Sequence, residues 1–165
     1  MIRMIVCCDM MGNIGKDNDL LFHIPQDMQF FRETTLNHVV LMGYKTYLSL
    51  DSKPLPKRKN IVLAEKEKHH LIQPHDNLIV TDNLDGIIGE CLGNGEEVFI
   101  IGGAFVYNDT LSKDMIDEAL ITFVPTVVEN ADASIHIELL AQRFRHAEKI
   151  KDFIDKNYAE SFNSN

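Results

Sequence analysis

Tryptophan is absent from this sequence of 165 residues, and cysteine is scarce, with only Cys7, Cys8 and Cys91. An odd number of cysteines without a CxxC spacing argues against a disulfide framework and a cysteine clamp for a metal, so we expect reduced thiols and no metal site. Long apolar runs are also missing, and the first residues lack the zones of a signal peptide. The sequence therefore predicts a cytoplasmic protein that does not enter a membrane.

Basic residues are outnumbered, because 16 lysines and arginines face 25 aspartates and glutamates, which gives a formal net charge of -9. This balance argues against general binding of nucleic acids. An anionic ligand would therefore need a local basic patch. The proline-stiffened segment of residues 53–59 offers one, although the same segment could be an ordinary solvated loop before a strand.

The nucleotide fingerprint GxGxxG is lacking too, yet the chain has the pattern of an α/β protein. Its length and its 45% of hydrophobic residues predict a single domain over residues 1–165. Because strands alternate with helices, we expect a mostly parallel sheet. The expected strands are 2–8, 38–43, 60–63, 77–80, 97–101 and 116–124, the helices include 25–35, 44–50 and 84–92, and 144–150 with 157–162 is the closing antiparallel pair.

One acid stands out in the expected helix over residues 25–35, which begins where a proline suits the first turn. Ile24, Met28 and Phe31 fall at i, i+4 and i+7 and predict one inward apolar stripe. Asp27 lies on or beside that stripe, where a carboxylate needs a partner or a function. The alternative is that Asp27 only complements the helix dipole or caps the helix.

Glycines follow two of the expected buried strands where helices begin, at Gly43 and at Gly102-Gly103. Such a junction points free backbone N–H groups at whatever lies there, and paired glycines let the backbone approach a ligand closely. The polar connection of residues 9–23 has the length of a lid or a binding loop. Each feature is a weak signal alone, but together they favour a ligand that carries a phosphate.

Taken in order, the motifs resemble those of the dihydrofolate reductase family from residue 1 to Asp132. They are Asn13-Ile14-Gly15, Ile24-Pro25-x-Asp27 with Phe31, Met42-Gly43-x-Lys45-Thr46, Pro54-Leu55-Pro56-x-Arg58-Lys59-Asn60, Ile101-Gly102-Gly103, Tyr107 and Thr122. The resemblance implies a single α/β domain whose mostly parallel sheet has about eight strands, an antiparallel C-terminal edge and about four flanking helices. It also implies that a monomer reduces dihydrofolate to tetrahydrofolate with NADPH and so supports one-carbon and thymidylate metabolism.

The resemblance assigns the chemistry to Asp27, which binds the amide and 2-amino edge of the pterin and favours its protonated ring nitrogen. A carboxylate in an apolar pocket costs desolvation unless donors satisfy it, and a pterin edge offers donors. Thr122 is implied to orient that carboxylate, and Phe22 stands where the family usually has a tryptophan. Arg58 is implied to clamp the glutamate α-carboxylate of folate, a bidentate pairing that suits arginine.

By the same resemblance, the substrate-binding residues are Ile5, Val6, Cys7, Met28, Phe31, Leu50, Leu55, Arg58, Ile101 and Tyr107. The implied cofactor-binding residues are Ile14, Gly15, Leu20, Gly43, Tyr44, Lys45, Thr46, Leu63, Ala64, Gly102, Gly103, Ala104, Phe105 and Val106. The family carries a cis peptide bond at the position of Gly102-Gly103.

Two departures from the family pattern carry expectations of their own. Phe22 lacks the indole N–H of the usual tryptophan, so we expect slower chemistry. Tyr44, Ala64 and Glu65 replace residues that usually hold the 2′-phosphate of NADPH, while Lys45 and Lys66 could offset part of the loss. We therefore expect a weaker preference for NADPH, which makes NADH a possible cofactor.

Two other functions fit part of the pattern. Pyrimidine reductases of riboflavin synthesis resemble this architecture, but Asp27, Phe31 and the Pro-Leu-Pro-x-Arg segment answer the folate-specific parts of the ligand. A non-catalytic or weakly active module that binds a pterin or a nucleotide could keep the pocket while changing at Phe22, Tyr44 and Glu65. A catalyst should bind both ligands and turn over, whereas a module should bind one or neither.

Overall fold

The computed structural model describes residues 1–165. Its strands are β1 (Ile2–Asp9), β2 (Asn13–Lys16), β3 (Asp19–Leu20), β4 (Val39–Gly43), β5 (Lys59–Leu63), β6 (Leu78–Thr81), β7 (Val98–Ile100), β8 (Glu118–Val124), β9 (Ala133–Ser134), β10 (His146–Asp152) and β11 (Tyr158–Asn163). Its α-helices are α1 (Pro25–Thr35), α2 (Tyr44–Ser49), α3 (Leu84–Gly93), α4 (Ala104–Ser112) and α5 (Glu138–Arg143), and short 3-10 helices are η1 (Lys66–Leu71) and η2 (Ile154–Lys156).

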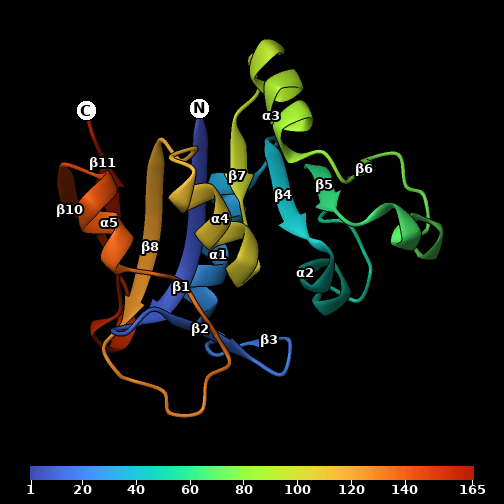
Figure 1. Cartoon of the computed structure of the whole chain (residues 1–165). Coiled ribbons are helices and arrows are strands. Elements are labelled where there is room, and N and C mark those ends of the chain that lie inside the picture. Colours follow the sequence, from blue (N-terminus) through green and yellow to red (C-terminus); the bar gives the residue numbers. More distant parts are fainter.

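The main sheet has eight strands in the order β10-β11-β8-β1-β7-β4-β5-β6. From β8 to β6 all neighbouring strands are parallel, and β11 runs antiparallel to both β8 and β10. Figure 1 shows this sheet with β1 and β8 side by side near its middle and with the C-terminal strands at one edge. The mostly parallel sheet with an antiparallel C-terminal edge is confirmed.

Two apolar layers bury the faces of the sheet, because the residues of each strand alternate between its faces. On β1, Met4 and Cys8 pack in the first layer with residues of α3, α4 and α5, and Ile5 packs in the second layer. Phe30 and Phe31 of α1 and Tyr47 of α2 cover that second layer. Figure 1 looks onto the α4 side of the sheet, with α1 behind it.

The predicted inward stripe of α1 is wrong at Met28, whose side chain is 56% exposed. Thr35 is the only buried residue of this helix. The reason is that α1 covers the sheet only in part, so the side of its first turns that carries Met28 faces solvent. The structure has five α-helices, the short α5 included, in line with the expected number of about four.

The long connection after β1 is more ordered than the sequence predicts. It forms a second, three-stranded sheet in the order β3-β2-β9. Asp9 organises its start: the buried carboxylate accepts hydrogen bonds from the backbone N–H groups of Met11, Asn13 and Val128 and from the Asn13 amide. These donors hold the pKa of Asp9 below its usual range even though burial opposes them.

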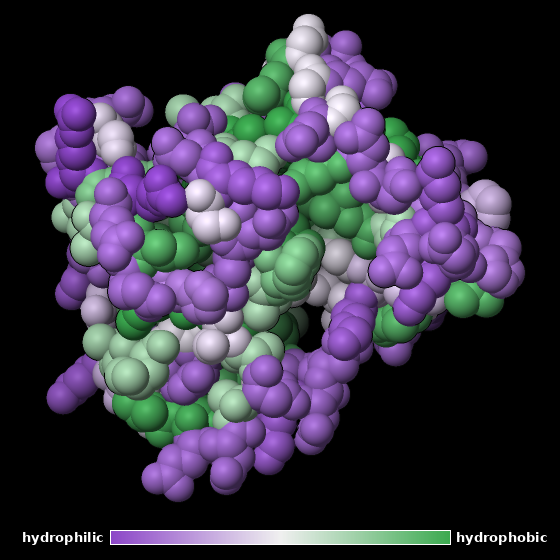
Figure 2. Space-filling model, in the orientation of Figure 1, coloured by the Kyte–Doolittle hydropathy of each residue, from purple (hydrophilic) through white to green (hydrophobic).

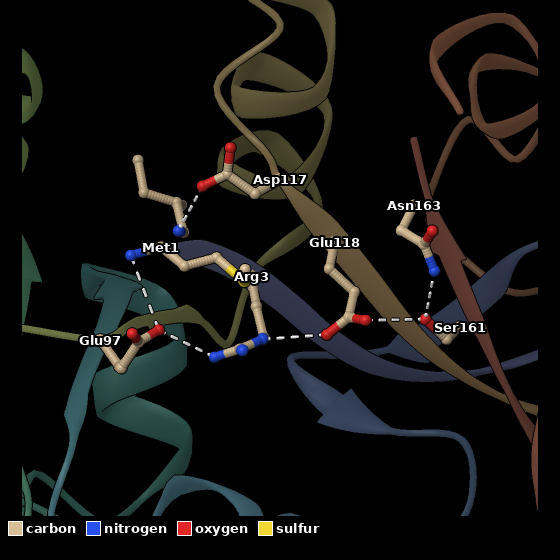
Figure 3. A network of polar contacts seen from close by, with 8 residues as sticks. Met1, Arg3, Glu97, Asp117, Glu118, Ser161 and Asn163 are labelled. Carbon is tan, nitrogen blue, oxygen red and sulfur yellow. Dashed lines mark hydrogen bonds and ion pairs between the residues drawn. The ribbon is translucent and has the colours of Figure 1, made fainter. Parts of the chain in front are cut away.

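At the opposite end of β1, a group of ion pairs joins the amino-terminal ends of the central strands (Figure 3). The Arg3 guanidinium donates to Glu97 beside β7 and to Glu118 on β8, each at 2.9 Å. The N-terminal ammonium lies 3.6 Å from the same Glu97 carboxylate. On its other oxygen, Glu118 accepts from the Ser161 hydroxyl of β11. One cluster therefore connects strands that lie far apart in the sequence.

No helix combines the length and the apolar character that a membrane crossing would need. All three cysteines are free thiols.

Candidate active site

Asp27 lies in the first turn of α1 and its side chain turns toward the sheet. No side chain caps this helix, so the capping alternative for Asp27 does not hold. Instead, its Oδ1 accepts a hydrogen bond of 2.5 Å from the hydroxyl of Thr122 on β8. In the parallel register of β1 and β8, Thr122 stands opposite Cys7, so their two side chains share one face of the sheet. The acid thus lies near the carboxyl ends of two central strands.

The C-terminal hairpin supports the helix that carries this acid. The backbone N–H of Ile154 donates to the Gln26 side chain at 3.0 Å, and the Phe153 ring packs edge-on against Phe30 with centroids 5.9 Å apart. These contacts hold the start of α1 near the ends of β1 and β8. The sequence signal for this support was absent, because the two segments lie more than a hundred residues apart.

Burial raises the pKa of Asp27, while the hydrogen bond from Thr122 and the Cys7 thiol lower it in part. The carboxylate is half-buried and accepts one side-chain hydrogen bond within the protein, from the Thr122 hydroxyl. A buried carboxylate with so few donors is stabilised by any ligand that brings more of them. The site is therefore suited to a planar ring with adjacent N–H groups.

Five of the predicted substrate residues belong to one apolar group. Ile5 belongs to the second layer of the core, and the partly buried side chains that pack on it include Phe31, Leu50, Leu55 and Ile101. Figure 2 looks onto the opposite, α4 face, where it shows a hollow between α4 and α2 with both hydrophobic and hydrophilic atoms at its edge. The structure brings the five substrate residues together in the second apolar layer.

Other predicted substrate residues lie differently. Val6 packs in the first layer, on the opposite face of β1 from Ile5, so its side chain lies away from this group. Met28 lies exposed at the rim. Tyr107 of α4 is 4% exposed, and its hydroxyl donates to the Ile5 carbonyl at 2.7 Å. Burial raises the pKa of Tyr107, so the phenol stays neutral and its hydrogen bond fixes the α4 side of β1.

Arg58 is 7% exposed, which rules out the simple reading of residues 53–59 as a solvated loop. Its Nε donates to the Pro56 carbonyl at 3.0 Å and its Nη1 to the hydroxyl of Thr35, at the end of α1, at 3.1 Å. Two of the five N–H groups of a guanidinium are thus used for holding it in place. Burial and the nearby Arg32 lower the pKa of Arg58. A bound carboxylate would stabilise the charged guanidinium and so oppose both effects.

The two glycine junctions contact each other. Gly43 ends β4 before α2, Gly102 and Gly103 lie between β7 and α4, and the Gly43 N–H donates to the Gly102 carbonyl at 2.8 Å. The Gly102-Gly103 bond is cis, as the resemblance implied. A Cβ at Gly102 would lie 3.2 Å from Thr46 Oγ1, and its φ of +128° disfavours other residues. Neither α2 nor α4 has a side-chain cap, so their first N–H groups remain for a ligand.

The remaining predicted cofactor residues lie on several elements of the fold. Ile14 is buried in the first layer, whereas Leu20 and Phe105 are exposed, Phe105 by 80%. The β2–β3 turn reaches α2, where the Asn18 amide donates to the Lys45 carbonyl at 3.0 Å. Phe22 lies half-buried between β3 and α1. Gly15 lies in β2, Leu63 and Ala64 at the end of β5, and Ala104 and Val106 in the first turn of α4.

Tyr44, at the start of α2, has an unexpected neighbour. The ammonium of Lys68 in η1 lies over the Tyr44 ring, 5.5 Å from its centroid. The His69 ring contacts the Ala64 carbonyl through Nε2 at 2.7 Å and holds η1 against the end of β5. Sequence reasoning considered Lys45 and Lys66 here and missed Lys68, because only the fold brings η1 beside α2.

A groove of about 710 Å³ opens at the other end of the sheet. Lysines and acids alternate along it, including Lys57, Lys59, Asp76 and Glu96, and Lys59 already pairs with Glu96 at 3.0 Å. The groove therefore has no excess charge of either sign, and Asp27 does not line it.

The carboxyl ends of parallel strands are where open α/β sheets bind ligands. Here that edge carries a half-buried acid, an apolar group of residues and two glycine junctions at helix starts. The fold and these features define an α/β protein whose sheet has polar and glycine-rich positions at its ligand-binding edge.

A family model described as dihydrofolate reductase matches residues 1–163, and the chain belongs to the dihydrofolate reductase family. A dihydrofolate reductase of Bacillus subtilis is 39% identical over 109 residues, which span 66% of this chain and 61% of that protein. One from Haemophilus influenzae is 32% identical over 126 residues, or 76% of this chain and 73% of that protein.

Among solved structures, a dihydrofolate reductase from Enterococcus faecalis in complex with NADP(H) and RAB-propyl superposes with a TM-score of 0.74. The match covers 98% of this chain and 93% of that chain at 24% identity, so it establishes the shared fold.

Proposed function

We propose that the protein reduces 7,8-dihydrofolate to 5,6,7,8-tetrahydrofolate with a hydride from NADPH. One observation carries the proposal: Thr122 holds the Asp27 carboxylate at the edge of the sheet where the glycine junctions also lie. Membership of the family supports it, as does the relative from E. faecalis, which binds NADP(H) in a similar fold.

On the substrate side, Asp27 accepts hydrogen bonds from the amide and amino edge of the pterin, and the apolar group around Ile5 and Phe31 packs on its faces. Because the half-buried carboxylate carries a negative charge, it stabilises positive charge on the ring and so favours protonation of the ring nitrogen. That protonation makes the neighbouring carbon a better hydride acceptor. Thr122 keeps the carboxylate in the plane that this contact needs.

On the cofactor side, the residues present fit a dinucleotide. The uncapped start of α4 offers backbone N–H groups to a phosphate, and side chains are absent at Gly43, Gly102 and Gly103, where a Cβ would crowd Val106 or Thr46. When bound, the reduced nicotinamide supplies the hydride. The chain's own part is to hold both ligands against the end of β1 and to exclude water with apolar side chains.

In this proposal Arg58 binds the glutamate carboxylate of folate. Its guanidinium is buried and fixed by Pro56 and Thr35, so little side-chain entropy remains to be lost when a carboxylate pairs with it. This pre-ordering favours affinity for a substrate with a carboxylate tail over one that ends at the ring.

The preference between NADPH and NADH is expected to be weak, because Glu65 repels a 2′-phosphate while the nearby cation of Lys68 attracts it. Both side chains are exposed, so salt screens both effects. The monomeric state and the cytoplasmic location expected from the sequence stay predictions.

The test follows the loss of reduced-nicotinamide absorbance with dihydrofolate, with NADPH and NADH in parallel. We expect turnover with NADPH, and its loss at neutral pH in Asp27→Asn, which keeps the shape and the acceptor oxygen but removes the charge. Folded protein that turned over with neither cofactor would refute the proposal and favour a binding module or a pyrimidine reductase. A ratio of affinities above about a hundredfold, some 2.8 kcal/mol, would refute the weak cofactor preference.

A further inference from the structure

The segment of residues 53–58 connects α2 to β5 without forming a helix or a strand of its own. Pro54 and Pro56 have no N–H group, so the segment cannot join the sheet through a regular ladder of hydrogen bonds. It nevertheless carries Leu55, which packs on the second apolar layer, and the buried Arg58. Whatever fixes its backbone therefore also decides where the Arg58 guanidinium lies.

A fully buried asparagine of β5 takes the place of a neighbouring strand. The side-chain Oδ1 of Asn60 accepts a hydrogen bond from the Leu55 backbone N–H at 2.9 Å. Its Nδ2 donates to the backbone carbonyls of Leu55 at 2.9 Å and of Arg58 at 3.0 Å. This side-chain amide thus pairs with Leu55 in both directions, as the peptide group of a neighbouring strand would.

A second asparagine repeats two of these contacts from the start of the next strand. Asn77 directly precedes β6, and its Nδ2 donates to the same carbonyls, of Leu55 at 3.1 Å and of Arg58 at 3.3 Å. The backbone carbonyl of Asn77 also accepts from the Asn60 N–H at 2.8 Å, which fixes the two asparagines relative to each other. Each carbonyl of the segment accepts from both side-chain amides, so neither can turn away without losing two hydrogen bonds inside the protein.

We propose that Asn60 and Asn77 are positioning residues for Arg58. They hold its backbone so that the guanidinium stays against Thr35 of α1, and this determines the preference for ligands with a carboxylate tail. The inference rests on the proposed function, because it concerns the same carboxylate site. Of the two acceptors of the guanidinium, the Pro56 carbonyl moves with the segment, whereas the Thr35 hydroxyl belongs to another element. The guanidinium therefore keeps both hydrogen bonds only while the segment stays fixed relative to α1.

The cations on either side of Arg58 have different surroundings. Lys57 is exposed, and Lys59 donates to Glu96 at 3.0 Å in the groove at the other end of the sheet. Of the three consecutive cations, Arg58 alone is buried. A buried side chain has few rotamers free of clashes, so its position follows its backbone closely.

The first test needs no ligand. It measures hydrogen exchange of the Arg58 Nε–H by NMR in protein labelled with nitrogen-15 arginine, with Arg58→Lys to assign the signal. Because this N–H belongs to a buried side chain and donates to the Pro56 carbonyl, it should exchange slowly in the unmutated protein. In Asn60→Ala it should exchange at least about tenfold faster, and by a larger factor than the backbone amides of β1, which report opening of the whole fold.

Two further variants complete this test. Asn77→Ala removes the two weaker contacts and should speed the exchange by about threefold; it carries the test alone if Asn60→Ala does not fold. Asn83→Ala is the matched control, because the exposed Asn83 accepts from the Gly86 N–H at 3.0 Å at the start of α3. It also loses a hydrogen bond between a side chain and the backbone, and it should leave the exchange of the Arg58 Nε–H unchanged.

The second test measures the preference for a carboxylate by titration calorimetry. The two ligands are folate and a folate whose α-carboxylate is replaced by a carboxamide. The unmutated protein should bind folate at least about tenfold more tightly, and this ratio should fall to about threefold or less in Asn60→Ala. A substitution that only loosened the fold would weaken the binding of both ligands and leave the ratio unchanged.

Exchange that rises no more than that of the β1 amides in both Asn60→Ala and Asn77→Ala would overturn the proposal. A ratio that Asn60→Ala leaves unchanged would also overturn it, as would a ratio near one in the unmutated protein. Neither test requires turnover, so their outcomes are separate from that of the reductase assay. Faster exchange and a reduced ratio in a protein without turnover would support the positioning role and refute the proposed function alone.

Discussion

Replacing Thr122 by valine tests the contact on which the proposed function depends. Thr122 is 2% exposed and valine has nearly the same shape, so the substitution removes the hydroxyl and leaves the packing almost unchanged. Asp27 then loses the 2.5 Å hydrogen bond to its Oδ1. A hydrogen bond to a charged group contributes about 1.5–3 kcal/mol.

That free energy should appear mainly in kcat/KM, because the carboxylate must be oriented when the ring becomes protonated. At about 1.4 kcal/mol for each factor of ten, the loss corresponds to a fall of roughly 10-fold to 150-fold. Steady-state assays with NADPH and dihydrofolate over a range of pH would measure it. The Asp27 titration should also move to higher pH, since the carboxylate form loses a donor.

Thr110→Val provides the matched control. Thr110 is also fully buried, and its hydroxyl donates to the Val106 carbonyl within α4, away from Asp27. We expect kcat/KM to change by less than about twofold in this variant. If Thr122→Val stayed within the same range as Thr110→Val, the reasoning that assigns Thr122 an orienting role would be refuted.

Three further predictions concern stability, cofactor and substrate. Asp27→Asn should stabilise the ligand-free protein by about 0.5–2 kcal/mol at neutral pH in thermal unfolding. The raised pKa of Asp27 means that its buried charge lowers the stability of the folded state at any pH above the pKa of the unfolded state. The gain should vanish as the pH falls below that value, and a loss of stability at neutral pH would contradict the prediction. Gly102→Ala should weaken NADPH binding at least about tenfold in equilibrium titrations, because the φ of +128° at Gly102 and the nearby Thr46 hydroxyl force the glycine junction to move. Unchanged affinity would count against a role of this junction in cofactor binding. Arg58→Lys should raise KM for dihydrofolate about tenfold with little change in kcat, because lysine lacks the fork that pairs with a carboxylate; a fall in kcat alone would point to another role.

Much of the fold could be predicted because its signals are local. Continuous apolar runs marked the buried strands such as β1, and the glycines at Gly43 and Gly102 marked where strands give way to helices. The closing hairpin was also predicted, as β10 and β11 lie within two residues of the expected segments. These signals depend on residues close together in the chain.

The site was predicted only in part, because its contacts depend on register and on the path of the chain. The motif around Asp27 identified the acid, but the position of Cys7 opposite Thr122 follows from the pairing of β1 with β8. The predicted burial of Met28 was wrong because helical periodicity identifies an apolar side of α1 but does not tell whether another element covers that side. Lys68 was missed because only tertiary structure brings it to Tyr44.

The ion-pair cluster around Arg3 and the acid site lie at opposite ends of the same strands. Arg3 and Cys7 are separated along β1 by about 13 Å, at about 3.3 Å for each residue of a strand. Energetic effects of substitutions at that distance usually add without coupling. The two ends of the sheet therefore contribute independently to the free energy of unfolding. Stability that is lost through a substitution at Asp27 can be regained by strengthening the ion-pair cluster around Arg3. Such a change in the cluster leaves the ligand preference of the Asp27 site unaltered.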